Sequence, residues 1–152
     1  MVHNVIGNLL DSNCDYICHQ VNCQGIMGSG IAKQIREKYP EVYASYAELC
    51  MNVGSRHLLG TIDIVDTNAR YDVINMFGQY SCGYDGKRYT SYDAFCKALE
   101  QIKSFVAPGS AIGFPKNIGC GLGGGNWNVI STMIEEVLGN DFEVYIYEYF
   151  GE

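Results

Sequence analysis

Apolar and polar residues follow two different periods along this chain. Residues 60–67 alternate between apolar and polar side chains, as a half-buried strand does, whereas the apolar residues of 90–106 recur at helical spacing. The same comparison predicts strands at 2–7, 15–22, 60–67, 71–77, 110–115 and 142–149, and helices at 29–38, 41–52, 90–106 and 128–138. Because strands alternate with helices, the pattern predicts an α/β sandwich with a mixed, partly parallel sheet.

Length and composition are those of a globular protein. The 152 residues favour one domain over 1–152, with 47% hydrophobic and 18% charged residues. No run of about 18 apolar residues is present to cross a membrane. Residues 1–15 lack the basic start and long apolar centre of a secretory signal. We therefore expect a cytoplasmic protein with no membrane partner.

Charge and cysteine spacing narrow the possible partners. The net charge of −7 comes from 10 basic and 17 acidic residues, and the basic residues are scattered, so we expect no strong nucleic-acid surface. Seven cysteines without a C-x-x-C pair, and three isolated histidines, do not form the clusters that a zinc site needs. The sequence therefore predicts no metal and no cofactor, and the charge is compatible with a small anion held by backbone groups.

Two glycine-rich loops share the same context. Residues 22–30 (NCQGIMGSG) follow one predicted strand and lead into a helix, and residues 116–126 (KNIGCGLGGGN) do the same later in the chain. Free N–H groups of a first helical turn, together with loop amides, form an anion site, and small residues leave those groups uncovered. If the two parent strands are neighbours, both loops lie at the carboxyl edge of the sheet, where such sheets bind ligands. The pair then suits a diphosphate.

Other motifs match in form but lack their structural context. The glycines of the second loop satisfy G-x-G-x-x-G, yet too few residues follow for a dinucleotide domain, and no P-loop motif is present. Cys50 and Arg56 match the C-x₅-R loop of cysteine phosphatases, but this cysteine ends a predicted helix instead of following a strand. His19 and Cys23 could face one way, although a histidine inside an apolar strand is more often packed and hydrogen-bonded.

The segments HQVNCQGIMGSGIAKQIREKYP and IGCGLGGGNW resemble those of macrodomains. Within that family the chain is most similar to the branch that holds the terminal ADP-ribose glycohydrolases, the DNA ADP-ribosyl glycohydrolases and the ADP-ribose-1″-phosphate phosphatase. The resemblance runs from IGNLL to VYIYEY. It implies a three-layer α/β/α sandwich around a mixed, partly parallel central sheet, with ADP-ribose as the ligand.

The resemblance also implies which residues contact the ligand. The two loops would hold the diphosphate and the distal ribose, Asn22 would approach that ribose, and Asn8 and Tyr147 would contact adenine. Asn8 stands where many macrodomains carry an aspartate, so its amide oxygen would accept from adenine without a charge. The expected ligand-binding set is Asn8, Gln24, Gly25, Met27, Gly28, Ser29, Gly30, Ile31, Ile118, Gly119, Cys120, Gly121, Leu122, Gly123 and Tyr147.

The catalytic groups of the related glycohydrolases are missing at the matching positions. Met76 or Phe77 stands in place of a lysine, and Gly123 in place of an aspartate. Asn22 and Gln79 are therefore the catalytic candidates, orienting sugar and water while loop amides stabilise developing charge. We expect a monomer that hydrolyses at the distal ribose, releasing ADP-ribose from a modified macromolecule or phosphate from ADP-ribose-1″-phosphate. A binding module without turnover is the alternative.

Overall fold

One mixed sheet organises the fold. In residues 1–151, which the computed structural model describes, six strands follow the order β1-β6-β5-β2-β4-β3. The strands are β1 (Val2–Ile6), β2 (Tyr16–Val21), β3 (Ile62–Val65), β4 (Asp72–Phe77), β5 (Ala111–Pro115) and β6 (Glu143–Glu148). The helices are the 3₁₀ turn η1 (Leu9–Asp11), α1 (Gly30–Lys38), α2 (Pro40–Asn52), α3 (Ser55–Leu58), α4 (Tyr92–Phe105) and α5 (Trp127–Leu138).

Strand direction follows from the connections. β3 runs antiparallel to β4, to which a short turn joins it, while the other neighbouring strands pair in parallel. Parallel pairs need a crossover, and helices provide several of these crossovers. The predicted α/β class and the mixed, partly parallel sheet are confirmed.

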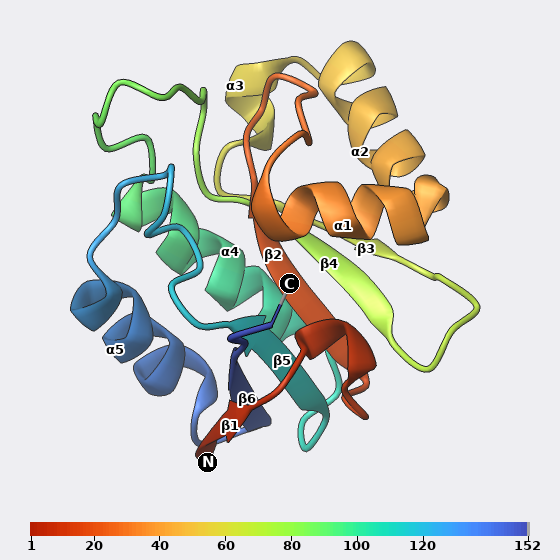
Figure 1. The fold of residues 1–152 in the computed structure, drawn as a ribbon, viewed down its shortest axis with the longest axis vertical. Helices are drawn as coiled ribbons and strands as arrows, with labels where there is room; N and C mark the ends of the chain where they lie inside the picture. Colours follow the sequence, from red (N-terminus) through yellow and green to blue (C-terminus); the bar gives the residue numbers. More distant parts are fainter. Residues whose placement is uncertain (152) are drawn as a thin grey trace.

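Helices cover both faces of the sheet, which gives three layers (Figure 1). Ile17 and Cys18 are neighbours on β2 and point to opposite faces, as successive strand residues do. Cys18 belongs to the core beneath α4 and α5, whereas Ile17 packs with Ile35 of α1 and Val42 of α2. β4 is buried from Val73 to Phe77 because it lies inside the sheet, between β2 and β3, and is covered on both faces.

Two short elements, η1 and α3, are not predicted by the hydrophobic pattern. Asn8 caps η1, since its Oδ1 accepts a hydrogen bond from the N–H of Leu10 at 3.0 Å. Single turns of this kind contain too few residues to show a hydrophobic period. Two of the longer helices start at a side-chain cap. Ser91 Oγ accepts from Ala94 N at 3.1 Å at the start of α4, and Asn126 Oδ1 accepts from Asn128 N at 2.8 Å at the start of α5.

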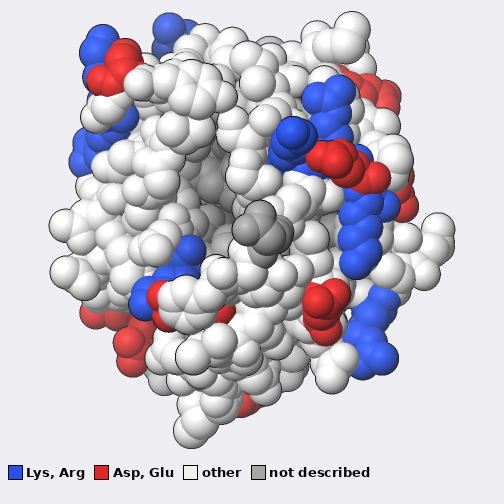
Figure 2. Space-filling model, viewed as in Figure 1, with Lys and Arg blue, Asp and Glu red and all other residues white. Residues whose placement is uncertain are grey.

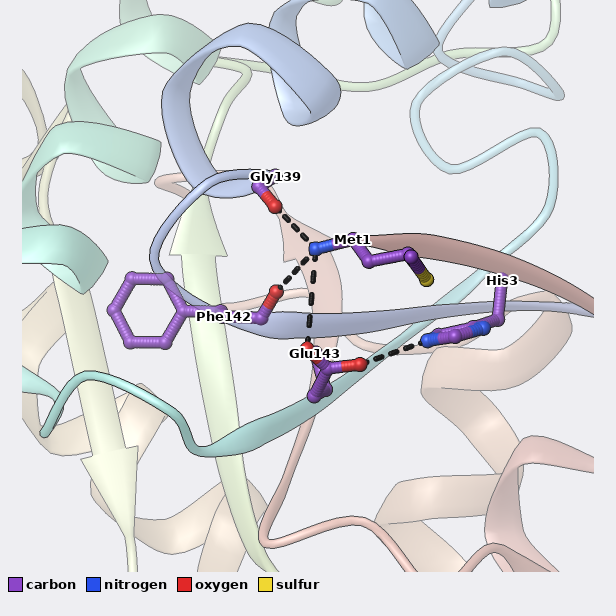
Figure 3. A network of polar contacts seen from close by, with 5 residues as sticks. All are labelled: Met1, His3, Gly139, Phe142 and Glu143. Atoms are coloured by element: carbon purple, nitrogen blue, oxygen red, sulfur yellow. Dashed lines mark hydrogen bonds and ion pairs between the residues drawn. The ribbon is translucent and has the colours of Figure 1, made fainter.

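Polar contacts join the edge strand β1 to β6 and to the segment that precedes β6 (Figure 3). The backbone nitrogen of Met1 donates to the carbonyl oxygens of Gly139 and Phe142. His3 Nε2 lies 2.9 Å from Glu143 Oε1 on β6. These contacts hold β1 in parallel register beside β6. Across residues 1–151, no helix is both long enough and apolar enough to span a membrane.

Candidate functional site

A cleft of about 650 Å³ opens at the carboxyl ends of β2, β4 and β5. Figure 2 shows the hollow on the face that Figure 1 presents, with mostly uncharged atoms around it. Three segments form its walls: the first glycine loop (22–30), the second glycine loop (116–126) and the β4–α4 loop (78–91). The two glycine loops, about 90 residues apart in the sequence, therefore face one crevice.

Asn22 organises the first glycine loop. Its Oδ1 accepts from the N–H of Gln24 at 2.9 Å and from the hydroxyl of Tyr46 at 2.7 Å, and its Nδ2 donates to the carbonyl of Ile26 at 2.8 Å. Gly25 adopts a φ of 80°, which a side chain rarely tolerates. Burial raises the pKa of Tyr46 well above its usual range, so its hydroxyl stays protonated. Asn22 lines the cleft, yet most of its hydrogen-bonding capacity shapes the loop.

The start of α1 points donors at the cleft. Ser29 occupies the N-cap position but makes no capping hydrogen bond, because its Oγ pairs with the hydroxyl of Tyr84 at 2.9 Å. The backbone N–H groups of Gly30, Ile31 and Ala32 precede the first intrahelical donor and have no partner within residues 1–151. All three residues line the cleft, where the helix dipole adds partial positive charge.

The second glycine loop presents another set of donors. Asn117, Gly119 and Gly124 have positive φ angles of 68°, 73° and 74°, so the backbone curls tightly after β5. Among the hydrogen bonds of residues 1–151, none uses the backbone N–H of Gly121 or Leu122. Both residues line the cleft, so consecutive unpaired amides form a concave surface that suits an anion.

The β4–α4 loop closes the third side. Gln79 Oε1 accepts from Gln20 Nε2 at 2.7 Å, and Gln79 Nε2 donates to the carbonyl of Ser81 at 2.9 Å. These bonds fix the Gln79 side chain on the wall of the cleft. Cys82 and Tyr84 follow on the same wall, and Tyr84 is 81% exposed.

The structure brings most of the expected residues to the cleft and leaves others outside it. Those on its walls are Asn22, Gly28, Ser29, Gly30, Ile31, Gln79, Ile118, Gly119, Gly121, Leu122 and Gly123. Those off its walls are Asn8, Gln24, Gly25, Met27, Cys120 and Tyr147. The walls also include residues that are not in the expected set, of which Ile26, Lys116 and Asn117 belong to the two glycine loops; they are Gln20, Val21, Ile26, Ala32, Cys82, Gly83, Tyr84, Pro115, Lys116 and Asn117.

Each residue outside the cleft is engaged elsewhere. Met27 is 1% exposed and packs in the apolar cluster of Tyr46 and Phe77, because the first loop turns this side chain inward. Gln24 Nε2 donates to the carbonyl of Tyr80 at 2.9 Å. Gly25 lies over Cys50 of α2.

The remaining three are held in a similar way. Asn8 uses its amide oxygen to cap η1. Tyr147 lies beside Gly7 and packs against the cluster around η1. Cys120 turns its Sγ toward the carbonyl of Ile118 at 3.3 Å and packs on the α4–α5 core.

Few titratable groups reach the cleft. Cys82, Tyr84 and Lys116 do so, while no Asp, Glu or His of residues 1–151 lies on its walls. Lys116 Nζ is 3.3 Å from Glu148 Oε2, an ion pair that offsets its charge. In the same residues no group of three or more His, Cys, Asp or Glu side chains could hold a metal ion.

His19 and Cys23 do not form a catalytic pair. His19 is fully buried on β2, its Nε2 is 2.5 Å from Asn75 Oδ1, and burial lowers its pKa to about 4. Cys23 Sγ instead donates to the carbonyl of Gln79 at 3.4 Å, and burial raises its pKa to about 11. A thiol with so high a pKa is a poor nucleophile at neutral pH.

Comparison with known proteins places the fold. No family model matches the chain. The ADP-ribose 1″-phosphate phosphatase of Scheffersomyces stipitis is 33% identical over 114 residues, which cover 70% of this chain and 64% of that protein. The DNA ADP-ribosyl glycohydrolase of Thermus aquaticus is 26% identical over 97% of this chain and 41% of its own length. The chain thus spans less than two thirds of either relative.

A solved structure matches nearly the whole chain. The macrodomain of Mycobacterium tuberculosis DarG superimposes with a TM-score of 0.79 at 24% identity, covering 97% of each chain. Its fold matches the three layers and the mixed sheet described above. The chain is therefore a macrodomain in fold.

Proposed function

We propose that the cleft binds ADP-ribose, with the diphosphate between the two glycine loops. The observation that carries this proposal is that unpaired amides from both loops line one cleft of about 650 Å³. Backbone donors hold phosphate oxygens without lysine or arginine, which accords with the acidic composition. The cleft volume lies in the range of small-molecule sites. The names of both curated relatives include an ADP-ribose group.

We further propose that the chain hydrolyses a bond at the distal ribose. The substrate would be either an ADP-ribosylated macromolecule or ADP-ribose-1″-phosphate. Support comes from the named activities of the relatives. With no carboxylate or imidazole on the cleft walls of residues 1–151, Gln79 would orient the attacking water and Asn22 would hold the sugar. The rate gain would come from orientation and from loop amides that stabilise developing negative charge.

A binding module without turnover is the second candidate, and one observation favours it. Met76 and Phe77 are fully buried in the sheet, and Gly123 has no side chain, so none of the three can donate or accept a proton at the ribose. General acid or base catalysis commonly contributes a hundredfold or more in rate, on the order of 10² to 10⁴. A cleft whose walls, within residues 1–151, carry no carboxylate or imidazole can still hold a ligand tightly.

A turnover assay separates the two candidates. The chain is incubated with ADP-ribosylated protein, with ADP-ribosylated DNA and with ADP-ribose-1″-phosphate, and the products are measured by mass spectrometry. If the chain is a hydrolase, one of these substrates should release free ADP-ribose, or ADP-ribose and phosphate in the case of ADP-ribose-1″-phosphate. Gln79→Leu should then slow this hydrolysis by about 100-fold. Gln34→Leu, an exposed site on α1, is the matched control. Saturable binding of ADP-ribose with no product from any substrate would leave only the binding module.

A further inference from the structure

Thr90 lies behind the second glycine loop and outside the walls of the cleft. Only 2% of this residue is exposed. Its Oγ1 donates to the carbonyl of Gly119 at 2.6 Å and accepts from Gln20 Nε2 at 2.8 Å, and its backbone N–H donates to the carbonyl of Gly123 at 2.9 Å. Thr90, at the end of the β4–α4 loop, therefore joins the end of strand β2 to the second glycine loop, and all three segments contribute residues to the cleft.

The second glycine loop fits closely around this hydroxyl. A Cβ at Gly123 would lie 2.6 Å from Thr90 Oγ1, and one at Gly119 would lie 3.2 Å from it. A Cβ at Gly125 would lie 3.5 Å from the Thr90 methyl group. By contrast, a Cβ at Gly121 would meet nothing within 4 Å. One side of the loop thus packs tightly against Thr90, while the other side, at Gly121, has free space beside it.

The Thr90 hydroxyl does not cap the neighbouring helix α4. Ser91, not Thr90, caps α4 through its own Oγ. Gln20 Nε2 has Gln79 as a second acceptor, and the Gly119 carbonyl accepts from Gly125 N–H as well. Removing the Thr90 hydroxyl would therefore loosen the loop without leaving those groups wholly unpaired.

We propose that Thr90 is a positioning residue that holds the second glycine loop in the conformation that binds the diphosphate. The identity of the ligand in this inference rests on the proposed function. The effect of Thr90 on the loop conformation does not. Thr90→Val keeps the shape of the side chain and removes the hydroxyl, while Thr90→Ser keeps the hydroxyl. A looser loop lowers the fraction of molecules in the binding-competent conformation, and the affinity for the ligand falls by the same factor.

Thr67 supplies a matched control. It is also buried, at 6% exposure, and its Oγ1 donates to the carbonyl of Tyr71 at 2.6 Å in the turn between β3 and β4. Thr67→Val removes an equivalent hydroxyl away from the cleft. A general loss of stability would affect both valine variants, whereas a positioning role affects Thr90→Val alone.

Two measurements test the proposal. Hydrogen–deuterium exchange should show faster exchange in peptides covering 117–125 for Thr90→Val, but not for Thr90→Ser or Thr67→Val. Calorimetric titration with ADP-ribose should give a Kd about tenfold weaker for Thr90→Val, with Thr90→Ser close to the wild type.

Unchanged exchange and unchanged affinity in Thr90→Val would overturn the proposal, and so would an equal loss of affinity in Thr67→Val. If the wild type does not bind ADP-ribose, the proposed function fails. The exchange measurement then still decides the role of Thr90, because it needs no ligand.

Discussion

Acidification should destabilise this fold through a single buried histidine. His19 on β2 is fully buried, and its Nε2 lies 2.5 Å from Asn75 Oδ1. Because an amide oxygen only accepts, Nε2 carries the proton and Nδ1 is the free acceptor. Within residues 1–151 Nδ1 has no hydrogen-bond partner. Protonation would therefore place a positive charge and an unpaired N–H in the core.

The magnitude follows from the pKa. Burial lowers the pKa of His19 from 6.5 to about 4, although the hydrogen bond with Asn75 acts in the opposite direction. The unfolded chain, in which His19 has its ordinary pKa of 6.5, binds the proton more tightly than the folded chain. The contribution of neutral His19 to the free energy of unfolding is therefore fully present above pH 6.5, and it is lost as the pH is lowered toward about 4. A difference of one pH unit between the folded and unfolded pKa corresponds to about 1.4 kcal/mol, so the full loss is about 3 kcal/mol.

Urea denaturation across this pH range measures the effect. The free energy of unfolding of the wild type is compared with that of His19→Gln, which cannot titrate but can still donate to Asn75. We expect the difference between the two proteins to shift by about 3 kcal/mol in favour of the variant between about pH 7 and about pH 4. His57→Gln, at an exposed site on α3, controls for the loss of a histidine. A difference that does not change with pH would refute this reasoning.

Two further predictions concern the walls of the cleft. Gly123→Ala should lower the free energy of unfolding by about 1–3 kcal/mol in urea, since the new Cβ would lie 2.6 Å from Thr90 Oγ1. Gly121→Ala in the same loop should have little effect, and equal losses would contradict the packing described here. Tyr84→Phe removes the hydrogen bond to Ser29, frees that hydroxyl beside the start of α1, and should tighten ADP-ribose binding about threefold by calorimetry. Weaker binding would instead mean that the Tyr84 hydroxyl contacts the ligand.

The regular elements could be predicted because their hydrophobic periods persist over several turns or pleats. β4, for example, is continuously apolar from Val73 to Phe77 apart from Asn75, and α4 repeats its apolar residues at helical spacing. The two glycine loops could be predicted from their place between a strand and a helix. The β4–α4 loop has no period, so its wall residues Cys82 and Tyr84 could not be found in this way.

The role of the glycines shows a second limit of the sequence. The sequence predicts that these glycines leave backbone N–H groups uncovered, and Gly121 fits that prediction. Gly119 and Gly123 are also needed because Thr90, about 30 residues earlier in the chain, lies against them. Met27 was expected at the ligand but lies in the core. Such distant contacts, and the direction in which a loop turns a side chain, depend on tertiary packing.

Calorimetric titration of ADP-ribose into the wild type, Gly121→Ala and Gly121→Glu tests the central claim most directly. Position 121 has room for a side chain, so the glutamate should leave the fold and the thermal midpoint intact while its carboxylate occupies the diphosphate site. We predict saturable binding by the wild type and Gly121→Ala, weaker binding of AMP, and no detectable binding by Gly121→Glu. Binding of ADP-ribose by a folded Gly121→Glu with unchanged affinity would contradict a diphosphate held between the two glycine loops.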